Sequence, residues 1–127
     1  MLKGKQISLY AVEREDLQQL LNWRNNPNFR KYFREYRELN MRQQEIWFEE
    51  KVVKDDTTLM FSIKRNEDNE LLGCCGFVYI NWVHRHADLS LYIGWEDSYI
   101  DDEGSAKESC RLLLDYGFNE LCLKYIE

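Results

Sequence analysis

Three runs of strand-forming residues in the middle of the chain constrain the fold more than any other feature. They are Thr58–Asn66, Leu72–Asn81 and Ala87–Trp95, and β-branched, aromatic and small residues are frequent in them. The segments between them are too short to hold a helix. Parallel neighbours need a long crossover, so these short connections favour antiparallel pairing in a hairpin or meander.

Helical patterns lie on both sides of this central part. Leucines recur at helical spacing behind an acidic first turn near the N-terminus, and Asn40 has the character of an N-cap. The order β-α-α-β-β-β-α-β, without a linker or repeat, predicts a single domain over residues 1–127. Its class is α+β, a mixed and mainly antiparallel sheet flanked by helices. The expected helices are Glu13–Asn25, Met41–Val53 and Gly104–Phe118, and the expected outer strands are Gln6–Val12 and Leu121–Ile126.

Composition narrows the classes of protein that the chain can belong to. At 127 residues and 44% hydrophobic content, the chain can build a core. Its formal net charge of −6 argues against a general nucleic-acid binder, which carries a basic surface. No apolar run approaches the roughly 18 residues of a membrane span, and the N-terminus lacks a signal-peptide pattern. The four cysteines form no C-x-x-C pair, so we expect free thiols in a cytoplasmic protein.

The stretch "DDEGSA", which opens the last predicted helix, has the character of a phosphate-binding loop. The small residues Gly104, Ser105 and Ala106, followed by Lys107, would let a phosphate approach the backbone N–H groups of a helix N-terminus. Acidic residues at positions 101–103 oppose an anionic ligand at that place. Acids before a helix are also ordinary N-terminal helix chemistry, so both interpretations stay open.

The element order and four phrases of the chain resemble the GNAT superfamily of N-acetyltransferases, and in particular its RimJ/RimL-like branch. The phrases are "ISLYAVEREDLQQLLNWRNNPNFRKYF", "RQQEIWFEE", "HADLSLYIG" and "GSAKESCRLLLDYGF". The acetyl-CoA loop of this family has the pattern Q/R-x-x-G-x-G/A, in which Gly104 and Ala106 match and Asp101 departs. The resemblance implies acetyl-CoA as the donor and a primary amine as the acceptor: a protein N-terminus, an aminosugar or a small amine.

The resemblance also implies roles for the strand in "DLSLYIG". In the family this strand separates from its neighbour, so that its backbone can pair with the pantetheine arm and polarise the thioester carbonyl. Leu91, Tyr92 and Ile93 occupy these positions here. A nearby carboxylate would take a proton from the amine, and Asp88 is the nearest candidate. Asp88 is otherwise a solvated strand residue or an ion-pair partner of Arg85.

Two further groups of residues are candidates for binding a ligand. The basic and aromatic stretch "NWRNNPNFRKYFREYR" contains Arg24, Arg30 and Tyr32, which would bind an anionic acceptor unless they form a solvated helix face. His84 and His86 lie two residues apart, but no third ligand has a clear spacing, so we interpret them as a surface turn and predict no metal site.

The C-terminal end differs from the family pattern. Family members continue past the strand matching "LCLKYIE", whereas this sequence stops at Glu127, so we expect a C-terminally truncated GNAT domain. It would be a piece of a longer chain, a shortened natural protein, or a half that a partner completes. An unfinished sheet leaves an open edge, which predicts a homo-oligomer formed through Leu121–Ile126. The alternative function is therefore a non-catalytic GNAT-like fragment that serves as a binding or oligomerisation module.

Overall fold

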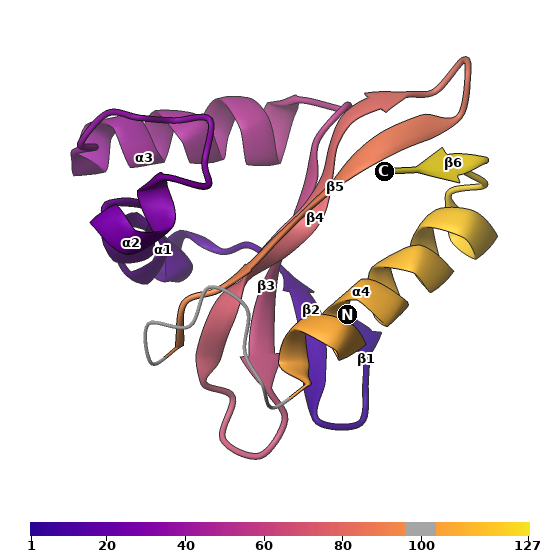
Figure 1. Ribbon diagram of the computed structural model, residues 1–127, viewed down its shortest axis with the longest axis horizontal. Coiled ribbons are helices and arrows are strands. Elements are labelled where there is room, and N and C mark those ends of the chain that lie inside the picture. The colour runs from indigo at the N-terminus through magenta and orange to yellow at the C-terminus, as the bar shows by residue number, and fades with distance from the viewer. Residues whose placement is uncertain (96–103) are drawn as a thin grey trace. The chain divides into compact units, whose positions relative to one another are not determined.

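The computed structural model describes residues 1–95 and 104–127. The chain divides into two compact units, each of which is described by itself. The first unit combines Met1–Val12 with Asp56–Glu127, and the second is Glu13–Asp55. Figure 1 shows that the first unit contains the sheet and helix α4, while the second contains the short helices α1 to α3. None of the helices in the described part of the chain is long and apolar enough to cross a bilayer.

The first unit is built on one six-stranded sheet whose strands follow the order of the chain. Successive strands from β1 to β5 pair antiparallel, and β5 pairs with β6 in parallel. The predicted antiparallel meander and the α+β class are thereby confirmed. The strands are β1 (Leu2–Lys3), β2 (Ile7–Ala11), β3 (Leu59–Arg65), β4 (Leu71–Asn81), β5 (His86–Ile93) and β6 (Tyr125–Ile126).

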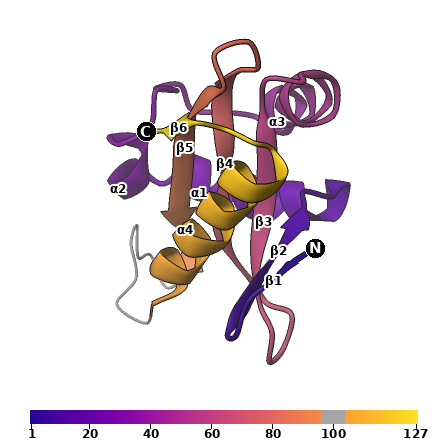
Figure 2. The same ribbon diagram turned by 90° about the vertical axis from the view of Figure 1, so that its right-hand side faces the viewer.

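Helix α4 (Ser105–Asp115) covers one face of this sheet and continues into a π-helical turn, Tyr116–Glu120. Figure 2 shows the helix lying across the strands. Its buried residues Ala106 and Leu113 belong to one apolar cluster with residues of β2 to β5. The ring of Tyr116 packs edge-on against Phe61 of β3, with centroids 5.8 Å apart. Burial of this apolar face is the main term that stabilises the unit. Further members of the cluster are Ile7, Leu9, Ile63, Cys75, Phe77 and Ile93.

Close approach of neighbouring strands explains a glycine of β4. A side chain at Gly73 would place its Cβ 2.2 Å from the carbonyl oxygen of Tyr92 on β5. A β-bulge in the pairing of β3 with β4 lies beside this glycine, between Ile63 and Lys64. The small residue therefore permits the backbone contact that joins β4 to β5.

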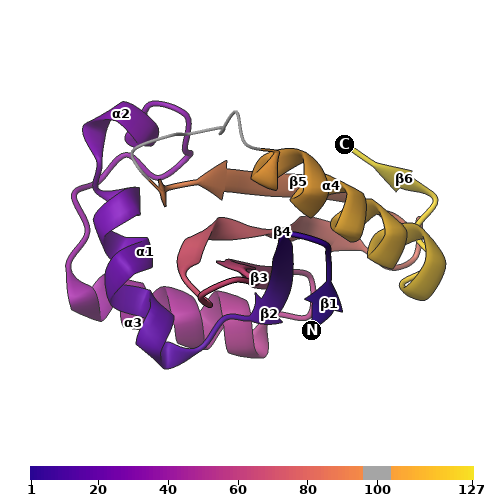
Figure 3. The ribbon, with the colours of Figure 1, turned by 90° about the horizontal axis from the view of Figure 1, so that it is seen from below.

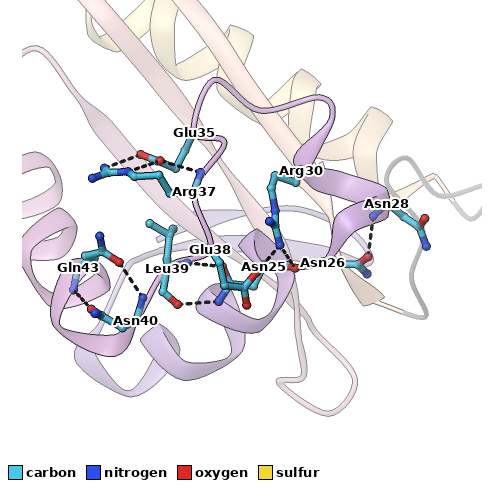
Figure 4. Close-up of polar contacts among 10 residues, drawn as sticks. All are labelled: Asn25, Asn26, Asn28, Arg30, Glu35, Arg37, Glu38, Leu39, Asn40 and Gln43. Carbon is cyan, nitrogen blue, oxygen red and sulfur yellow. Dashed lines mark hydrogen bonds and ion pairs between the residues drawn. The ribbon is translucent and has the colours of Figure 1, made fainter.

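The second unit consists of short helices, two of which are capped at their N-terminal ends by asparagine side chains. A 3₁₀ turn, Arg14–Asp16, leads into α1 (Leu17–Arg24), and the predicted single helix from Glu13 therefore begins with a tighter turn. Figure 4 shows the next two caps: Asn26 accepts a hydrogen bond from the Asn28 N–H, and Asn40 accepts one from Gln43 at 2.9 Å. The predicted N-cap at Asn40 is thus present. The remaining helices are α2 (Pro27–Arg30), α3 (Met41–Trp47) and a π-helical segment, Phe48–Lys54.

The C-terminal strand is shorter than its sequence pattern indicates. The pattern predicted a strand over Leu121–Ile126, but only Tyr125–Ile126 pairs, and the first part of that prediction is wrong. Cys122 adopts a φ of 58°, and the Leu123 N–H donates to the Gly117 carbonyl at 2.9 Å, which turns the chain back against the helix end. Leucines alternate here because they pack on the core around a turn, not because they form a strand.

Candidate functional site

The edge of β5 that faces away from β4 is covered by β6 at one end only. The two strands pair at His86 and Ala87, and the Leu89 N–H donates to the Glu127 carbonyl oxygen at 2.8 Å. Figure 3 shows β6 beside only the beginning of β5. Beyond Leu89, no strand in the described part of the chain lies against this edge.

The alternation of the ladder decides which residues offer backbone groups on the open edge. Leu89 directs its N–H towards β6, whereas the Gly94 N–H donates to Leu72 at the start of β4. Because successive residues of a strand point their backbone groups to opposite sides, Leu91 and Ile93 face the open edge and Tyr92 pairs with β4. The predicted trio therefore divides into two residues with outward backbone groups, about 7 Å apart along the strand, and one that holds the strand in the sheet.

The beginning of α4 adds a second set of backbone donors. Gly104 precedes the helix with a φ of 93°, in the left-handed region that favours glycine, and no atom of the described residues outside its chain neighbours lies within 4 Å of the place of a Cβ there. Ser105 and Ala106 are buried, and Lys107 is exposed. The first N–H groups of a helix have no acceptor within the helix and carry a partial positive charge.

The acidic residues Asp101, Asp102 and Glu103 lie outside the residues that the structure describes. Their predicted opposition to a phosphate therefore stays a prediction.

Glu108, which sequence reasoning did not single out, fixes α4 to the sheet. Its Oε1 atom accepts hydrogen bonds from the N–H groups of Gln6 at 2.9 Å and Ile7 at 2.8 Å. Burial acts to raise the pKa of this carboxyl, but the backbone hydrogen bonds and the nearby Arg111 outweigh it and the pKa is lowered. The acidic residue in the first helical turn was the signal available in the sequence, but it did not indicate the partner.

The first turn of α4 and the end of β5 lie at the same end of the sheet. Ile93, Gly73, Ile63 and Leu9 are paired in one row across β5, β4, β3 and β2. Ile7, which binds Glu108, lies two residues before Leu9 on β2. The backbone N–H groups in the first turn of α4 and the last residues on the open edge of β5 therefore lie at the same end of the sheet. This arrangement suits a ligand that has phosphates at one end and an extended, amide-containing arm, as CoA does.

Asp88 lies at the opposite end of β5, five residues and roughly 17 Å before Ile93. It lines a hollow of about 250 Å³ together with His86, Ala87, Tyr125 and Glu127. Asp88 and Glu127 thus line one hollow, and Asp88 does not lie at the end of β5 that is nearer to α4's first turn. The side chain of Arg85, its alternative partner, donates to the Leu121 carbonyl at 3.4 Å.

The predicted acceptor residues belong to the second unit, where the two arginines contact other residues of the same unit. Arg24 donates to the buried Gln44 at 2.6 Å and stacks over the Trp47 ring at 5.2 Å. Arg30 forms an ion pair with Glu38 and also donates to a backbone carbonyl (Figure 4). These contacts are structural in character, so the acceptor role of the two arginines stays a prediction.

Tyr32 is the exposed member of the predicted acceptor group. Its side chain is 57% exposed, and the Lys31 ammonium lies 5.2 Å from its ring. The segment between Asn25 and Leu39 is closed by two hydrogen bonds. The Asn25 side-chain amide accepts from the Leu39 N–H and donates to the Leu39 carbonyl, each at 2.8 Å (Figure 4). Whether Tyr32 contacts an acceptor also stays a prediction.

The histidines and cysteines show no metal or disulfide chemistry in the part of the chain that the structure describes. The rings of His84 and His86 stack with centroids 6.4 Å apart, but no group of three potential ligands is found among these residues. All four cysteines are free thiols. Burial raises the pKa of the Cys75 thiol well above its usual range, which disfavours the reactive thiolate.

Comparisons with known proteins agree with this geometry. Spermidine N(1)-acetyltransferase of Vibrio cholerae is 31% identical over 97% of the chain and 68% of that protein, and the Escherichia coli K12 enzyme is 30% identical over 97% and 63%. The chain thus spans about two thirds of their length. The crystal structure of the V. cholerae enzyme with CoA and spermine superposes with a TM-score of 0.82, at 27% identity over 94% of this chain and 68% of that one.

The family model described as "Acetyltransferase (GNAT) domain" matches residues 6–127. The predicted cosubstrate, acetyl-CoA, is the acetyl donor of this family. The RimJ/RimL-like branch stays a prediction, because the relatives above acetylate spermidine. The open edge of β5, the glycine that opens α4 and the match over nearly the whole sequence together establish that this chain belongs to the GNAT family of acetyltransferases.

Proposed function

We propose that this protein transfers the acetyl group of acetyl-CoA to a primary amine of a polyamine such as spermidine. The observation that carries the proposal is the open edge of β5 beyond Leu89, which runs towards the end of the sheet where the first turn of α4 lies. The polyamine is supported by relatives named as spermidine acetyltransferases over 97% of the chain. The net charge of −6 also favours a polycationic acceptor over an anionic one.

The chain's own residues would bind and orient the donor. The first-turn N–H groups of α4 favour phosphate, and the outward backbone groups of Leu91 and Ile93 suit the amides of the pantetheine arm. Acetyl-CoA supplies an activated thioester. A backbone N–H beside the thioester oxygen stabilises the negative charge that develops when the amine attacks.

The acceptor side of the reaction requires a neutral amine. An ammonium group would bind near the acidic residues Asp88 and Glu127, which line the same hollow. Asp88 then accepts a proton from the amine, directly or through water. The amine nitrogen forms a bond to the acetyl carbon, the carbon–sulfur bond breaks, and CoA leaves as the thiolate. Arg24 and Arg30 offer nothing to a cationic acceptor, so they would matter only for an anionic one.

We also propose that the protein is a cytoplasmic homo-oligomer. A spermidine N-acetyltransferase of V. cholerae has a dodecameric structure that superposes with a TM-score of 0.75 at 28% identity. Light scattering at tens of micromolar should report an assembly larger than the 15.4 kDa monomer. A clean monomer contradicts this part of the proposal.

The activity is tested by measuring thiol release from acetyl-CoA with a panel of amines. We expect turnover with spermidine and spermine, and weaker turnover with a peptide N-terminus or glucosamine. Mass spectrometry should find one added acetyl group on the polyamine. If the protein binds CoA but acetylates only the peptide, the RimJ/RimL-like assignment is favoured over the polyamine. If it neither binds CoA nor releases thiol, the non-catalytic alternative is favoured.

A further inference from the structure

Arg65 lies at the end of the sheet where α4 begins. It is paired with Ile7, whose N–H donates to Glu108 in the first turn of that helix. Paired residues of an antiparallel ladder project their side chains to the same face. Because Ile7 is buried in the cluster beneath α4, the Arg65 side chain lies on the face that α4 covers.

The Arg65 guanidinium is held in place by two contacts. Its Nε and Nη2 atoms donate to the Asp68 carboxylate at 3.0 and 2.8 Å. Its carbon centre lies 5.0 Å from the ring centroid of Trp95, the residue just beyond the open edge of β5. A guanidinium has five N–H donors and this pairing uses two, while the side chain is 28% exposed. Among the described residues, the hydrogen bonds of this oriented cation use only these two donors.

We propose that Arg65 binds a phosphate of CoA, with Asp68 and Trp95 as positioning residues that hold its guanidinium. The inference rests on the proposed use of acetyl-CoA and names a specificity residue of that same site. Arg65 lies at the end of the sheet where the first turn of α4 is fixed through Ile7, and its guanidinium contacts Trp95, two residues after the end of β5. A planar guanidinium is well suited to phosphate oxygens.

Charge explains why such a residue is useful in this chain. The sequence places three acids at positions 101–103, immediately before the helix. The partial charge of a helix N-terminus is about half a unit, which is small beside three carboxylates. The Arg65 guanidinium adds a positive charge on the sheet face that α4 covers, part of which Asp68 balances. The hydrogen bond to Asp68 also raises the pKa of Arg65, so the guanidinium stays charged throughout the pH range of any binding experiment.

The test is a calorimetric titration of CoA into the wild-type protein and into Arg65→Met. The substitution keeps the length of the side chain and removes its charge. We expect the Kd for CoA to rise about 10-fold, as for one lost charge-assisted contact. The difference should shrink as salt is raised, because an ionic contact is screened. Arg65→Lys restores the charge and should recover part of the affinity.

The phosphate is identified by repeating the titration with 3′-dephospho-CoA. If Arg65 binds the 3′-phosphate, the wild-type protein and Arg65→Met bind 3′-dephospho-CoA equally. If Arg65 binds the pyrophosphate, the difference in Kd between the two proteins persists.

Lys64→Met is the matched control. Lys64 neighbours Arg65 on β3, but its side chain faces the opposite side of the sheet. Like Arg65, it lies over an aromatic ring: its Nζ atom is 5.6 Å from the centroid of the Tyr10 ring. We expect this control to leave the Kd for CoA unchanged.

Three results would overturn the inference. One is wild-type affinity for CoA in a folded Arg65→Met protein, which leaves the proposed acetyltransferase function intact. Another is that Arg65→Met and Arg65→Lys lose CoA affinity to the same extent and also lose melting temperature to the same extent, which shows a purely structural role for Arg65. The third is no binding of CoA by the wild-type protein, in which case the proposed donor fails as well.

Discussion

Removing the Glu108 side chain should destabilise the first unit through the contact between α4 and β2. In Glu108→Ala, the N–H groups of Gln6 and Ile7 lose their acceptor. Ile7 is 1% exposed, so water cannot readily replace the carboxylate there. A hydrogen bond to a charged group contributes roughly 1.5–3 kcal/mol. The bond from Gln6 is exposed to water and contributes less than the bond from Ile7. The expected loss in the free energy of unfolding is therefore about 2–4 kcal/mol, or roughly 7–15 °C in Tm for a chain of this size.

Glu108→Gln separates the charge from the geometry. Both N–H groups donate to Oε1 of the carboxylate, and a glutamine can present its carbonyl oxygen at the same place. We expect a smaller loss of about 1 kcal/mol at pH 7. The folded-state pKa of Glu108 is lowered from 4.5, so the wild-type advantage over Glu108→Gln is present above pH 4.5 and is lost as the pH falls through the folded value.

Urea unfolding followed by circular dichroism, at pH 7 and at several points below pH 4.5, measures both effects. Glu120→Gln is the matched control, because this exposed glutamate lies at the far end of the same helical segment. It should change the free energy of unfolding by less than about 0.5 kcal/mol. The reasoning is refuted if Glu108→Ala is as stable as the control, or if the loss in Glu108→Gln is the same at pH 3 as at pH 7.

Three further predictions concern the donor and acceptor sites. Leu91→Pro removes an outward N–H without breaking the ladder to β4, so it should weaken CoA binding at near-normal Tm, whereas Tyr92→Pro should lower the Tm. Equal losses of Tm in the two variants would show that the backbone N–H groups of Leu91 and Tyr92 do not point to opposite edges of β5. Asp88→Asn should lower kcat by roughly 100-fold at neutral pH with little change in CoA affinity, and unchanged kcat in the thiol-release assay would exclude Asp88 as the base. The double change Asp101→Gln and Asp102→Gly should tighten CoA binding by roughly 1–3 kcal/mol, and equal calorimetric affinities would show that these acids do not oppose the ligand.

Features that depend on neighbours in the chain could be predicted from the sequence. The short connections between Thr58 and Trp95 permit only antiparallel pairing, and the structure has that meander. Asn40 caps α3, because a cap needs only its own side chain and the next three residues. Gly104 precedes α4 for a similarly local reason, since its left-handed backbone conformation favours glycine.

Features that depend on register were decided by the tertiary structure. The sequence alone placed Leu91, Tyr92 and Ile93 together on one strand, but pairing with β4 and β6 directs the first and third to the open edge and the second into the sheet. The alternating pattern "LCLKYIE" predicted a strand, but its first part forms a core-packed turn. Only contact with the helix end selected the turn, as the bond from Leu123 to Gly117 shows.

The contacts that complete the candidate site join residues far apart in the chain. Glu108 binds the backbone of Ile7, 101 positions away, and the Arg65 guanidinium stacks on Trp95 from a different strand. Periodicity and capping act over a few residues, so no local pattern could indicate these partners. The sequence by itself determined the three central strands and that a glycine opens the last helix. The tertiary structure determined which end of the sheet that helix meets, because packing of the buried face of α4 sets the position of its first turn.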